Sequence, residues 1–393
     1  MYKIGLQMLT QDKAKFIGLI LSLSFSALII TQQTAIFFGI MMRTYSTITD
    51  TPQAEIWVMD PNVQHIDDVN PLRDTDLYRI RSIDGVEWAV PLFKGLIRAR
   101  LPDGHYQTCI LQGVDDATFI GGPCNMLQGS LYDLRAPDAV IIDDYELDKL
   151  SFTRASSPVR PEFIEGASLE HPVVGDTLEL NDRRAVIVGI SRLTRTFLTY
   201  PIIYTTYNRA LFYAPYERKL LSFVLVKANS TTPAEQLCET IHTLTGLQAL
   251  TKQQFENKTI SYYLHQTGIG VNFGLTILFG ILIGAALAGQ IFFSFVVSNL
   301  AYLALLSVLG ASKRLLAQIT IIQALWVALL SWHIGTGAAA AIGFATQATR
   351  TSFYMPLSLY LATGLIIFII CFIASLIAIS KIYKIELGEL FKQ

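Results

Sequence analysis

The segment Leu303-Ala-Leu-Leu-Ser-Val-Leu-Gly-Ala-Ser-Lys-Arg-Leu-Leu316 lies within a long region that is almost free of charge. No Asp, Glu, Lys or Arg occurs from residue 259 to residue 312, and after Lys313 and Arg314 the next charged residue is Arg350. An apolar run of about 20 residues is long enough to cross a bilayer as a helix. The region therefore predicts three spanning helices, with Lys313 and Arg314 in the turn between the first two.

The helices are expected at about Val271–Val297, Ala317–Thr346 and Met355–Ile379. A fourth uncharged run, Phe16–Met42, predicts a first spanning helix. A cleaved signal peptide is the alternative, but the run is too long and ends without a small-residue cleavage site. Basic residues concentrate in short cytoplasmic loops, so both termini and the turn at Lys313 are expected on the cytoplasmic side.

The turn itself has a predicted geometry. Gly310 suits the left-handed residue that ends a helix, and Ser312 suits the N-cap of the next one. Leu305, Leu306 and Leu309 then form an apolar stripe at helical spacing, just outside the membrane. An ordinary connection between two membrane helices is the alternative interpretation of these residues.

The composition is too apolar for a soluble protein and too polar for spanning helices alone. The chain has 393 residues, of which 52% are hydrophobic and 16% charged, and its mean hydropathy is +0.42. The fold class expected is a membrane protein with four transmembrane α-helices and a large α+β extracytoplasmic domain between helices 1 and 2. Acidic residues outnumber basic ones in that domain, which argues against a nucleic-acid partner.

The expected organisation has three parts. Residues 1–44 hold the N-terminus and helix 1, residues 45–265 the extracytoplasmic domain, and residues 266–393 helices 2–4 with a loop at about 299–316 and a cytoplasmic tail. Within the domain, residues 45–126 and 216–265 predict an α+β part built from both ends of the segment, and residues 127–215 a β-rich insertion.

Local signals place the elements of this domain. Strands are expected at Glu55–Asp60, Val86–Phe93, Gly95–Leu101, Tyr106–Gly113, Leu221–Lys227 and Leu247–Thr251. One helix is expected to begin at Asp74 or Thr75. A second is expected to begin with a capping box, Thr232-Pro-Ala-Glu235, and to end at Gly246. A hairpin is expected at Val174–Ile190, with Asn181 and Asp182 in its turn, and a loop at Ser151–Pro161.

The residues that carry chemistry are few and scattered. No phosphate-binding G-x-x-x-x-G-K-[ST] sequence is present, so ATP would have to be hydrolysed elsewhere. We expect no catalytic residues, no cofactor and no metal, because the acidic pairs Asp67-Asp68, Asp115-Asp116 and Asp143-Asp144 have no third ligand at suitable spacing. A disulfide between Cys109 and Cys124 and buried free thiols are both open. His333 is ionisable at membrane depth and so is a candidate for a role in transport, or else an interfacial residue.

The helix expected at Ala317–Thr346 contains a stretch of small residues, Gly335-Thr-Gly-Ala-Ala-Ala-Ala-Ile-Gly343. Small residues let two membrane helices approach closely. Gly335, Gly337 and Gly343 are therefore candidates for a dimer interface.

Several segments resemble one family. The segment Ala304-Leu-Leu-Ser-Val-Leu-Gly-Ala-Ser-Lys-Arg-Leu315 resembles the coupling element of ABC-transporter permeases of the MacB/FtsX/LolC type. The hairpin at Val174–Ile190 resembles one in the MacB-type periplasmic domain. The tail Lys381–Lys392 resembles the family's C-terminal ending, with Glu386-Leu387 in place of Asp-Pro. The stretches Ala54–Pro61 and Val90–Phe93 further resemble the DevC branch.

The resemblance implies a function. The chain would be the permease subunit of a bacterial inner-membrane ABC system, with ATP bound and hydrolysed by a separate ATPase subunit. The residues that would dock on the ATPase are Leu305, Leu306, Leu309, Gly310, Ala311, Lys313 and Arg314. The expected partners are that ATPase, a second copy or a related permease, membrane lipid and, for export, a periplasmic membrane-fusion adaptor.

Two functions follow from this resemblance. The first is export or extraction of a lipid-like or other envelope substrate. The second is regulation of a periplasmic envelope enzyme without transport, as in FtsX-like proteins. A membrane-anchored receptor or enzyme is a third alternative, but it would leave the coupling sequence without a purpose and the chain offers no catalytic constellation for it.

Overall fold

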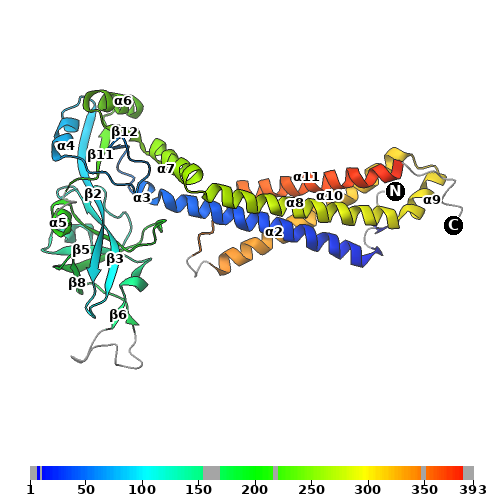
Figure 1. Cartoon of the computed structure of the whole chain (residues 1–393), viewed down its shortest axis with the longest axis horizontal. Helices are drawn as coiled ribbons and strands as arrows, with labels where there is room; N and C mark the ends of the chain where they lie inside the picture. Colours follow the sequence, from blue (N-terminus) through cyan, green and yellow to red (C-terminus); the bar gives the residue numbers. More distant parts are fainter. Residues whose placement is uncertain (1–6, 9–10, 154–168, 216–219, 347–350, 384–393) are drawn as a thin grey trace. The chain divides into compact units, whose positions relative to one another are not determined.

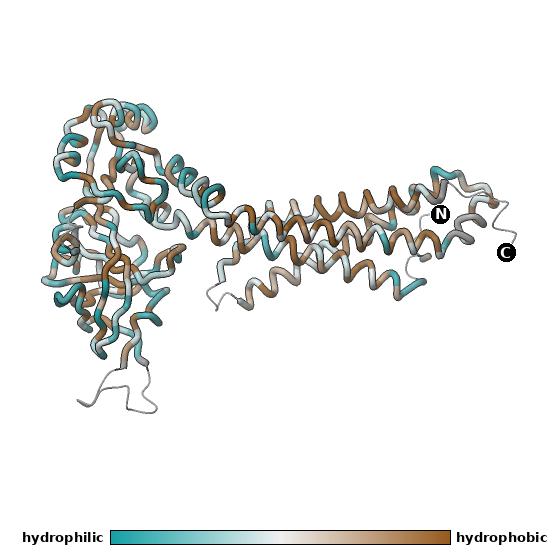
Figure 2. The backbone as a smooth tube through the Cα atoms, viewed as in Figure 1, coloured by the Kyte–Doolittle hydropathy of each residue, from teal (hydrophilic) through white to brown (hydrophobic). Residues whose placement is uncertain are grey.

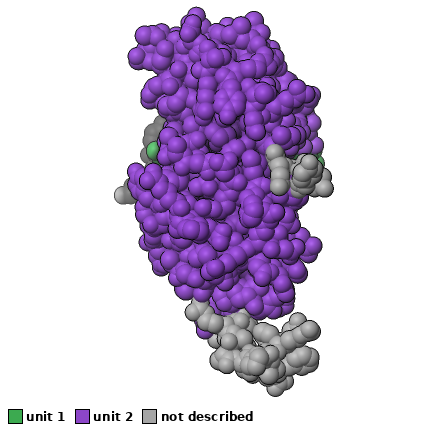
Figure 3. Space-filling model, turned by 90° about the vertical axis from the view of Figure 1, so that its left-hand side faces the viewer, with its two compact units in different colours: residues 1–41, 267–393 green, residues 42–266 purple. Residues whose placement is uncertain are grey.

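The structure is a computed structural model that describes residues 7–8, 11–153, 169–215, 220–346 and 351–383. The expected C-terminal tail from residue 384 and most of the expected loop at Ser151–Pro161 lie outside these residues. The chain divides into two compact units, one formed by residues 1–41 and 267–393 and the other by residues 42–266. Residues 42–266, here called the inserted domain, form one continuous body (Figure 3).

Four helices of the first unit are long and apolar enough to cross a membrane. They are α2 (Lys13–Thr44), α8 (Ile269–Ser298), α10 (Lys313–Ala345) and α11 (Leu357–Tyr383). Figure 2 shows that apolar residues predominate along all four. The prediction of four spans with an α+β domain between the first and second is confirmed. A fifth, short helix, α9 (Leu300–Val308), lies between α8 and α10 (Figure 1).

Small residues set the close packing of α2 and α10. A Cβ added at Gly335 would clash with the carbonyl oxygen of Ser24 and lie 2.6 Å from the Cβ of Ala27. About one turn earlier, Ser331 Oγ donates a hydrogen bond to the carbonyl of Ile20 at 3.3 Å. Such approaches require a hydrogen or hydroxymethyl side chain, because any larger group would separate the two backbones.

The other helices pack in the same way. Gly284 of α8 faces Ser26 of α2, where an added Cβ would lie 2.6 Å from the hydroxyl oxygen. Gly364 of α11 faces the indole of Trp332, which donates from Nε1 to the carbonyl of Tyr360 at 3.0 Å. The result is a bundle with one shared apolar core drawn from α2, α8, α10 and α11.

The inserted domain is built on one ten-stranded sheet in the order β12-β1-β11-β2-β3-β10-β5-β9-β4, with β8 paired to β2 and β9. The strands are β1 (Ile56–Met59), β2 (Val86–Arg100), β3 (Tyr106–Val114), β4 (Met126–Gln128), β5 (Ala139–Asp143), β8 (Thr177–Leu180), β9 (Arg183–Ser191), β10 (Ile202–Thr206), β11 (Phe223–Ala228) and β12 (Gln248–Thr251). A separate pair joins β6 (Phe152–Thr153) to β7 (Leu169–Glu170).

Strand β2 changes partner half-way along its length. Its first half pairs with β11 as far as Leu92, and its second half pairs with β3 from Phe93 onward. The prediction of two separate strands, Val86–Phe93 and Gly95–Leu101, is therefore wrong: the chain continues straight through Lys94 and Gly95. We call β12, β1, β11 and the first half of β2 lobe A, and the remaining strands lobe B.

The two faces of the sheet have different covers. One face packs against α4 (Asp74–Arg81), α5 (Tyr207–Tyr213) and α6 (Ala234–Thr245). The other is covered by the segment from α3 (Ser46–Thr49) to Val69, by α7 (Lys252–Gln266), by η1 (Leu131–Arg135) and by residues 193–200. Trp57, fully buried, packs edge-on against Phe223 and beside Phe255 in this second core.

Local turn chemistry was mostly predictable. Asn181 and Asp182 both adopt positive φ (50° and 61°), as a two-residue hairpin turn requires, and Gly246 ends α6 in the left-handed conformation. The expected capping box at Thr232–Glu235 is wrong, because Pro233 occupies the N-cap position and no side-chain capping bond forms. Helix α4 begins at Asp74 and is capped at Arg73.

Candidate functional site

The α9 segment ends in a well-formed helix stop. The amide of Ala311 donates to the carbonyl of Leu306 at 3.0 Å, and that of Gly310 to the carbonyl of Ser307 at 3.1 Å. With Gly310 at φ +96°, these two bonds form a Schellman motif, in which Ala311 and Leu306 also pack against the bundle core. Ser312 then caps α10, its hydroxyl accepting from the amide of Leu315 at 3.3 Å. The predicted roles of Gly310 and Ser312 are those seen in the structure.

One face of α9 leaves apolar side chains uncovered. Leu305 is 57% exposed and Leu309 is 71% exposed, and Tyr302 and Val308 are exposed beside them. These four residues, here called the α9 apolar face, recur at spacings of three, three and one, so they lie on one side of a helix.

Leu306 does not belong to this face, although the sequence grouped it with Leu305 and Leu309. It is half-buried and packs on the bundle core. The predicted stripe did not include Tyr302 and Val308, although they lie three residues before and after Leu305 and so share its face of the helix. The three leucines alone had defined that stripe.

Basic residues lie at the same end of the bundle as α9. Lys313 and Arg314 are exposed at the start of α10. At the start of α2, Lys15 Nζ donates to Ser298 Oγ at 2.6 Å and pairs with Asp12 at 3.0 Å. Because Ser298 ends α8, the beginning of α2 lies beside the junction of α8 and α9.

The three candidate interface glycines have different surroundings. Gly335 is occupied by α2, and Gly343 lies directly against the ring of Phe353 in the same chain. These contacts within the chain explain the small size of both residues. Gly337 has nothing within 4 Å of an added Cβ, so it has open space for contact with another molecule.

His333 is exposed on the bundle surface. Its Nδ1 lies 2.8 Å from the carbonyl oxygen of Leu329, and its ring lies 4.6 Å from that of Trp332. The His333 ring is thus bonded to its own helix and packs edge-on against Trp332.

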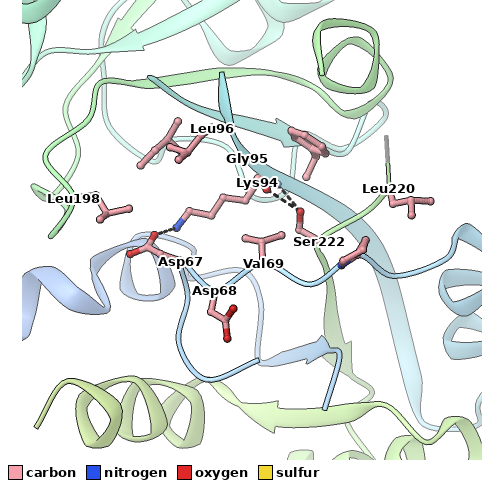
Figure 4. Close-up of a pocket in the computed structure, with 12 residues that line it drawn as sticks. Asp67, Asp68, Val69, Lys94, Gly95, Leu96, Leu198, Leu220 and Ser222 are labelled. Carbon is pink, nitrogen blue, oxygen red and sulfur yellow. Dashed lines mark hydrogen bonds and ion pairs between the residues drawn. The ribbon is translucent and has the colours of Figure 1, made fainter. Parts of the chain in front are cut away.

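A pocket of about 450 Å³ lies where the two lobes of the inserted domain meet (Figure 4). This volume is within the usual range for small-molecule sites, about 300–1,000 Å³. It was not foreseen from the sequence because its lining comes from positions far apart in the chain. Its lining includes Asp67, Asp68, Val69, Phe93, Lys94, Leu96, Ile110, Leu198, Leu220 and Ser222.

A buried ion pair lies beside the pocket. Lys94 Nζ lies 2.6 Å from Asp67 Oδ1, and the two side chains are only 4% and 9% exposed. The ammonium group also lies 3.4 Å from the carbonyl oxygen of Ile66 and 3.5 Å from Thr47 Oγ1. Its three N–H groups are thus accounted for. This pair joins β2, at the point where it changes partner, to the loop that precedes α4.

Helix α7 contacts the segments that form two walls of the pocket. The His65 ring stacks on Tyr262 at 4.4 Å and lies 5.3 Å from Tyr263, and the His65 loop continues into Asp67 and Asp68. The Tyr263 ring also lies 4.8 Å from that of Phe197, the neighbour of Leu198. Burial lowers the pKa of His65, with Asp67 and Asp68 opposing the shift, so this ring packs in its neutral form near pH 7.

The remaining candidates take structural roles. All four cysteines are free, and Cys109 is buried whereas Cys124 is exposed, so the suggested disulfide does not form. Asp144 pairs with Arg192 at 2.6 Å, and Asp115 accepts from the hydroxyl of Thr118 at 2.7 Å. Within the described ranges, no three His, Cys, Asp or Glu side chains gather in an arrangement that could hold a metal.

Four apolar spans with a large α+β domain inserted after the first define a class of multi-pass membrane protein. A family model described as the MacB-like periplasmic core domain matches residues 18–244, and one described as the FtsX-like permease C-terminal matches residues 274–387. The chain belongs to the MacB/FtsX-type family of ABC permeases and is a multi-pass inner-membrane protein. Permeases of this family work with a partner ABC ATPase.

Three solved structures are similar to part of the chain at low identity. The extracellular domain of the noncanonic ABC-type transporter YknZ from Gram-positive bacteria is 13% identical, with a TM-score of 0.33, covering 50% of this chain and 98% of its own. The periplasmic region of MacB from Actinobacillus actinomycetemcomitans is 14% identical, with a TM-score of 0.37, covering 53% and 94%. A domain of a putative permease protein from Porphyromonas gingivalis is 14% identical, with a TM-score of 0.32, covering 50% and 88%. No curated protein matches the chain.

Proposed function

We propose that the chain is the permease subunit of a system that exports or extracts a lipid-like envelope substrate, with ATP bound and hydrolysed only by a separate ATPase subunit. The single observation that supports coupling to that subunit is the α9 apolar face. A monomer that leaves Tyr302, Leu305, Val308 and Leu309 uncovered gains about 1.5–3 kcal/mol for each large apolar side chain that a partner buries. The rigid Schellman stop at Gly310 holds this face in place against α10.

Motion would reach the inserted domain along the chain itself. Helix α7 is followed, after Gly268, by α8, and α8 leads directly to α9. Tyr262 and Tyr263 of α7 contact His65 and Phe197, which lie within two residues of the pocket-lining Asp67 and Leu198, so a displacement of α7 would change the pocket. This arrangement favours a role in which the inserted domain acts on a substrate that it holds.

The second candidate is an FtsX-like regulator that transmits force to a periplasmic envelope enzyme. The same α7 contacts would transmit motion in such a regulator. There the surface of the inserted domain, and not its pocket, would contact the envelope enzyme. A neighbouring gene for a membrane-fusion adaptor, as expected for the DevC branch, favours export, whereas a neighbouring gene for a hydrolase or its activator favours regulation. In either system the permease would act as a homodimer or beside a related permease.

We further propose that both termini and the α9 segment are cytoplasmic. Lys15, Lys313 and Arg314 lie at one end of the bundle, and such clusters face the cytoplasm. Compartment reporters fused at Asn125 and Lys392 should report opposite sides of the membrane. If both report the same side, this topology is wrong.

The docking proposal is tested by replacing Leu309 with Asp and co-purifying the ATPase. Burying an unpaired carboxylate costs several kcal/mol, and about 1.4 kcal/mol is already tenfold in an equilibrium. Leu309→Asp should therefore reduce ATPase recovery by at least tenfold at unchanged permease expression. Leu309→Met, which keeps the apolar surface, and Lys313→Ala, which removes an exposed charge worth about 0–1 kcal/mol, are the controls. Equal recovery with Leu309→Asp and Leu309→Met would exclude this face as the docking site.

A further inference from the structure

On the face of the sheet that contains the pocket, side chains change from buried to exposed along β2 and β3. The register pairs Lys94 with Gln112, Leu96 with Ile110, Arg98 with Thr108 and Arg100 with Tyr106. Residues two apart on a strand share a face, so these four pairs form successive rungs on one side of the sheet. The first rung is buried under the cover of residues 45–71, the second lines the pocket, and the third and fourth are largely exposed.

The polar groups inside the pocket are already satisfied within the protein. Lys94 is paired with Asp67, and its backbone exchanges two hydrogen bonds with Ser222 Oγ, at 2.9 and 3.0 Å. Asp68 accepts from the amide of Gln64 at 2.9 Å, and its carboxylate points away from Lys94 and Leu96 (Figure 4). What remains for an occupant is apolar: Val69, Leu96, Ile110, Leu198 and Leu220.

The next rung offers a positive charge. Among the described residues, Arg98 has no ion-pair partner, and its guanidinium lies over the ring of Tyr106 at 4.9 Å. A position over an aromatic ring orients the guanidinium, and two N–H groups on one edge of a guanidinium can bind one carboxylate or phosphate together. Arg100, one rung further, is already paired with Glu179 at 3.1 Å. Successive rungs lie about 7 Å apart, so an acidic group attached to a chain in the pocket would reach Arg98.

We propose that this pocket and Arg98 form a binding site for an amphiphile with one acidic group, whose apolar chain enters between Leu96, Leu198 and Leu220 while its carboxylate or phosphate binds Arg98. The hydroxyl of Thr108, opposite Arg98 in the register, is a second donor for the acid. This inference rests on the proposed handling of a lipid-like substrate and names its chemistry. The walls of the site come from both lobes, with Leu220 and Val69 from the side of lobe A and Leu96 and Leu198 from lobe B.

The test uses the full chain in discs of phosphatidylcholine, without the ATPase. A dodecanoic acid that carries a diazirine on its chain is the probe, and labelled peptides are mapped by mass spectrometry after irradiation. The matched probe has trimethylammonium in place of the carboxylate. Leu96→Trp and Leu220→Trp fill the pocket from opposite walls, at positions that are 44% and 40% exposed and so tolerate a larger side chain. Arg98→Gln removes the anchor, and Arg100→Gln is its matched control on the same face.

The proposal expects the acid to label β2 and β3 and either tryptophan to abolish that labelling. Arg98→Gln should raise the half-saturating concentration about tenfold, the effect of losing about 1.4 kcal/mol, whereas Arg100→Gln should change it less than twofold. Competition by lysophosphatidic acid would identify a membrane lipid as the source, and competition only by free fatty acid a soluble one. Labelling that survives both tryptophans would overturn the pocket, and equal effects of the two arginine variants, or preference for the ammonium probe, would overturn the acidic group. None of these results depends on ATPase docking, which Leu309→Asp tests separately.

Discussion

Lys94→Met should destabilise the inserted domain by removing one half of a buried ion pair. The side chain of Asp67 is only 9% exposed, and without Lys94 its carboxylate would be left unpaired next to His65, which packs as a neutral ring. Breaking a buried pair in this way typically costs about 3–5 kcal/mol. Asp67→Asn should cost a similar amount, because it leaves the ammonium group of Lys94 buried with neutral acceptors alone: the new amide oxygen, the carbonyl of Ile66 and the hydroxyl of Thr47.

The double substitution Lys94→Met/Asp67→Asn distinguishes pairing from simple packing. With both charges gone, no unpaired charge remains buried, so the double variant should be more stable than either single one. A domain of this size shifts its melting temperature by about 2–4 °C per kcal/mol, so each single substitution should lower the transition by about 10 °C. Thermal unfolding followed through tryptophan fluorescence measures this, because Trp57 and Trp88 of the inserted domain contribute to the signal. A double variant whose loss equals the sum of the two single losses would refute the reasoning.

Two further predictions concern single residues, one in the helix bundle and one in the inserted domain. Gly335→Ala should sharply reduce the yield of folded monodisperse protein in size-exclusion chromatography, because its Cβ meets the backbone of Ser24, whereas Gly337→Ala, with nothing within 4 Å, should not. Burial raises the pKa of Asp143 from 3.8 to about 7, and the nearby Glu146 and Asp144 add to this shift. Because the pKa is higher in the folded protein than in the unfolded chain, protonated Asp143 contributes fully to the free energy of unfolding below pH 3.8, and this contribution is lost as the pH rises through 7. Asp143→Asn should therefore raise the melting temperature at pH 8, by the equivalent of at most about 4 kcal/mol, and leave it nearly unchanged at pH 4; a larger gain at pH 4 than at pH 8 would contradict this assignment.

The sequence predicted the elements whose causes are local. The four spans follow from uncharged runs that have no other stable home, and Gly310, Ser312 and Gly246 stop or start helices through their own backbone preferences. Asn181 and Asp182 likewise make a hairpin turn that only a few residue types adopt.

What the sequence did not predict depends on distant partners. Lys94 and Gly95 looked like an interruption of β2, because a lysine in a central strand is unfavourable unless something neutralises it. The neutralising group, Asp67, lies 27 residues earlier in the chain, and no local pattern connects the two. The helical phase of α9 was misjudged for a related reason: whether Leu306 or Tyr302 is exposed depends on where the bundle core lies, which the spacing of leucines alone does not determine.

The passage of β2 from one lobe into the other bears on how the inserted domain responds to mechanical load. A domain whose halves were joined by a flexible linker would open like a clamshell when one half was pulled. Here the halves share one unbroken strand, which is bonded along its first half to β11 and along its second half to β3. Traction along β2 would load these bonds in parallel, as in shear, instead of breaking them one after another as in peeling. The sheet should therefore behave as a stiff beam, and most of the compliance of the domain should lie in the loops that cover it.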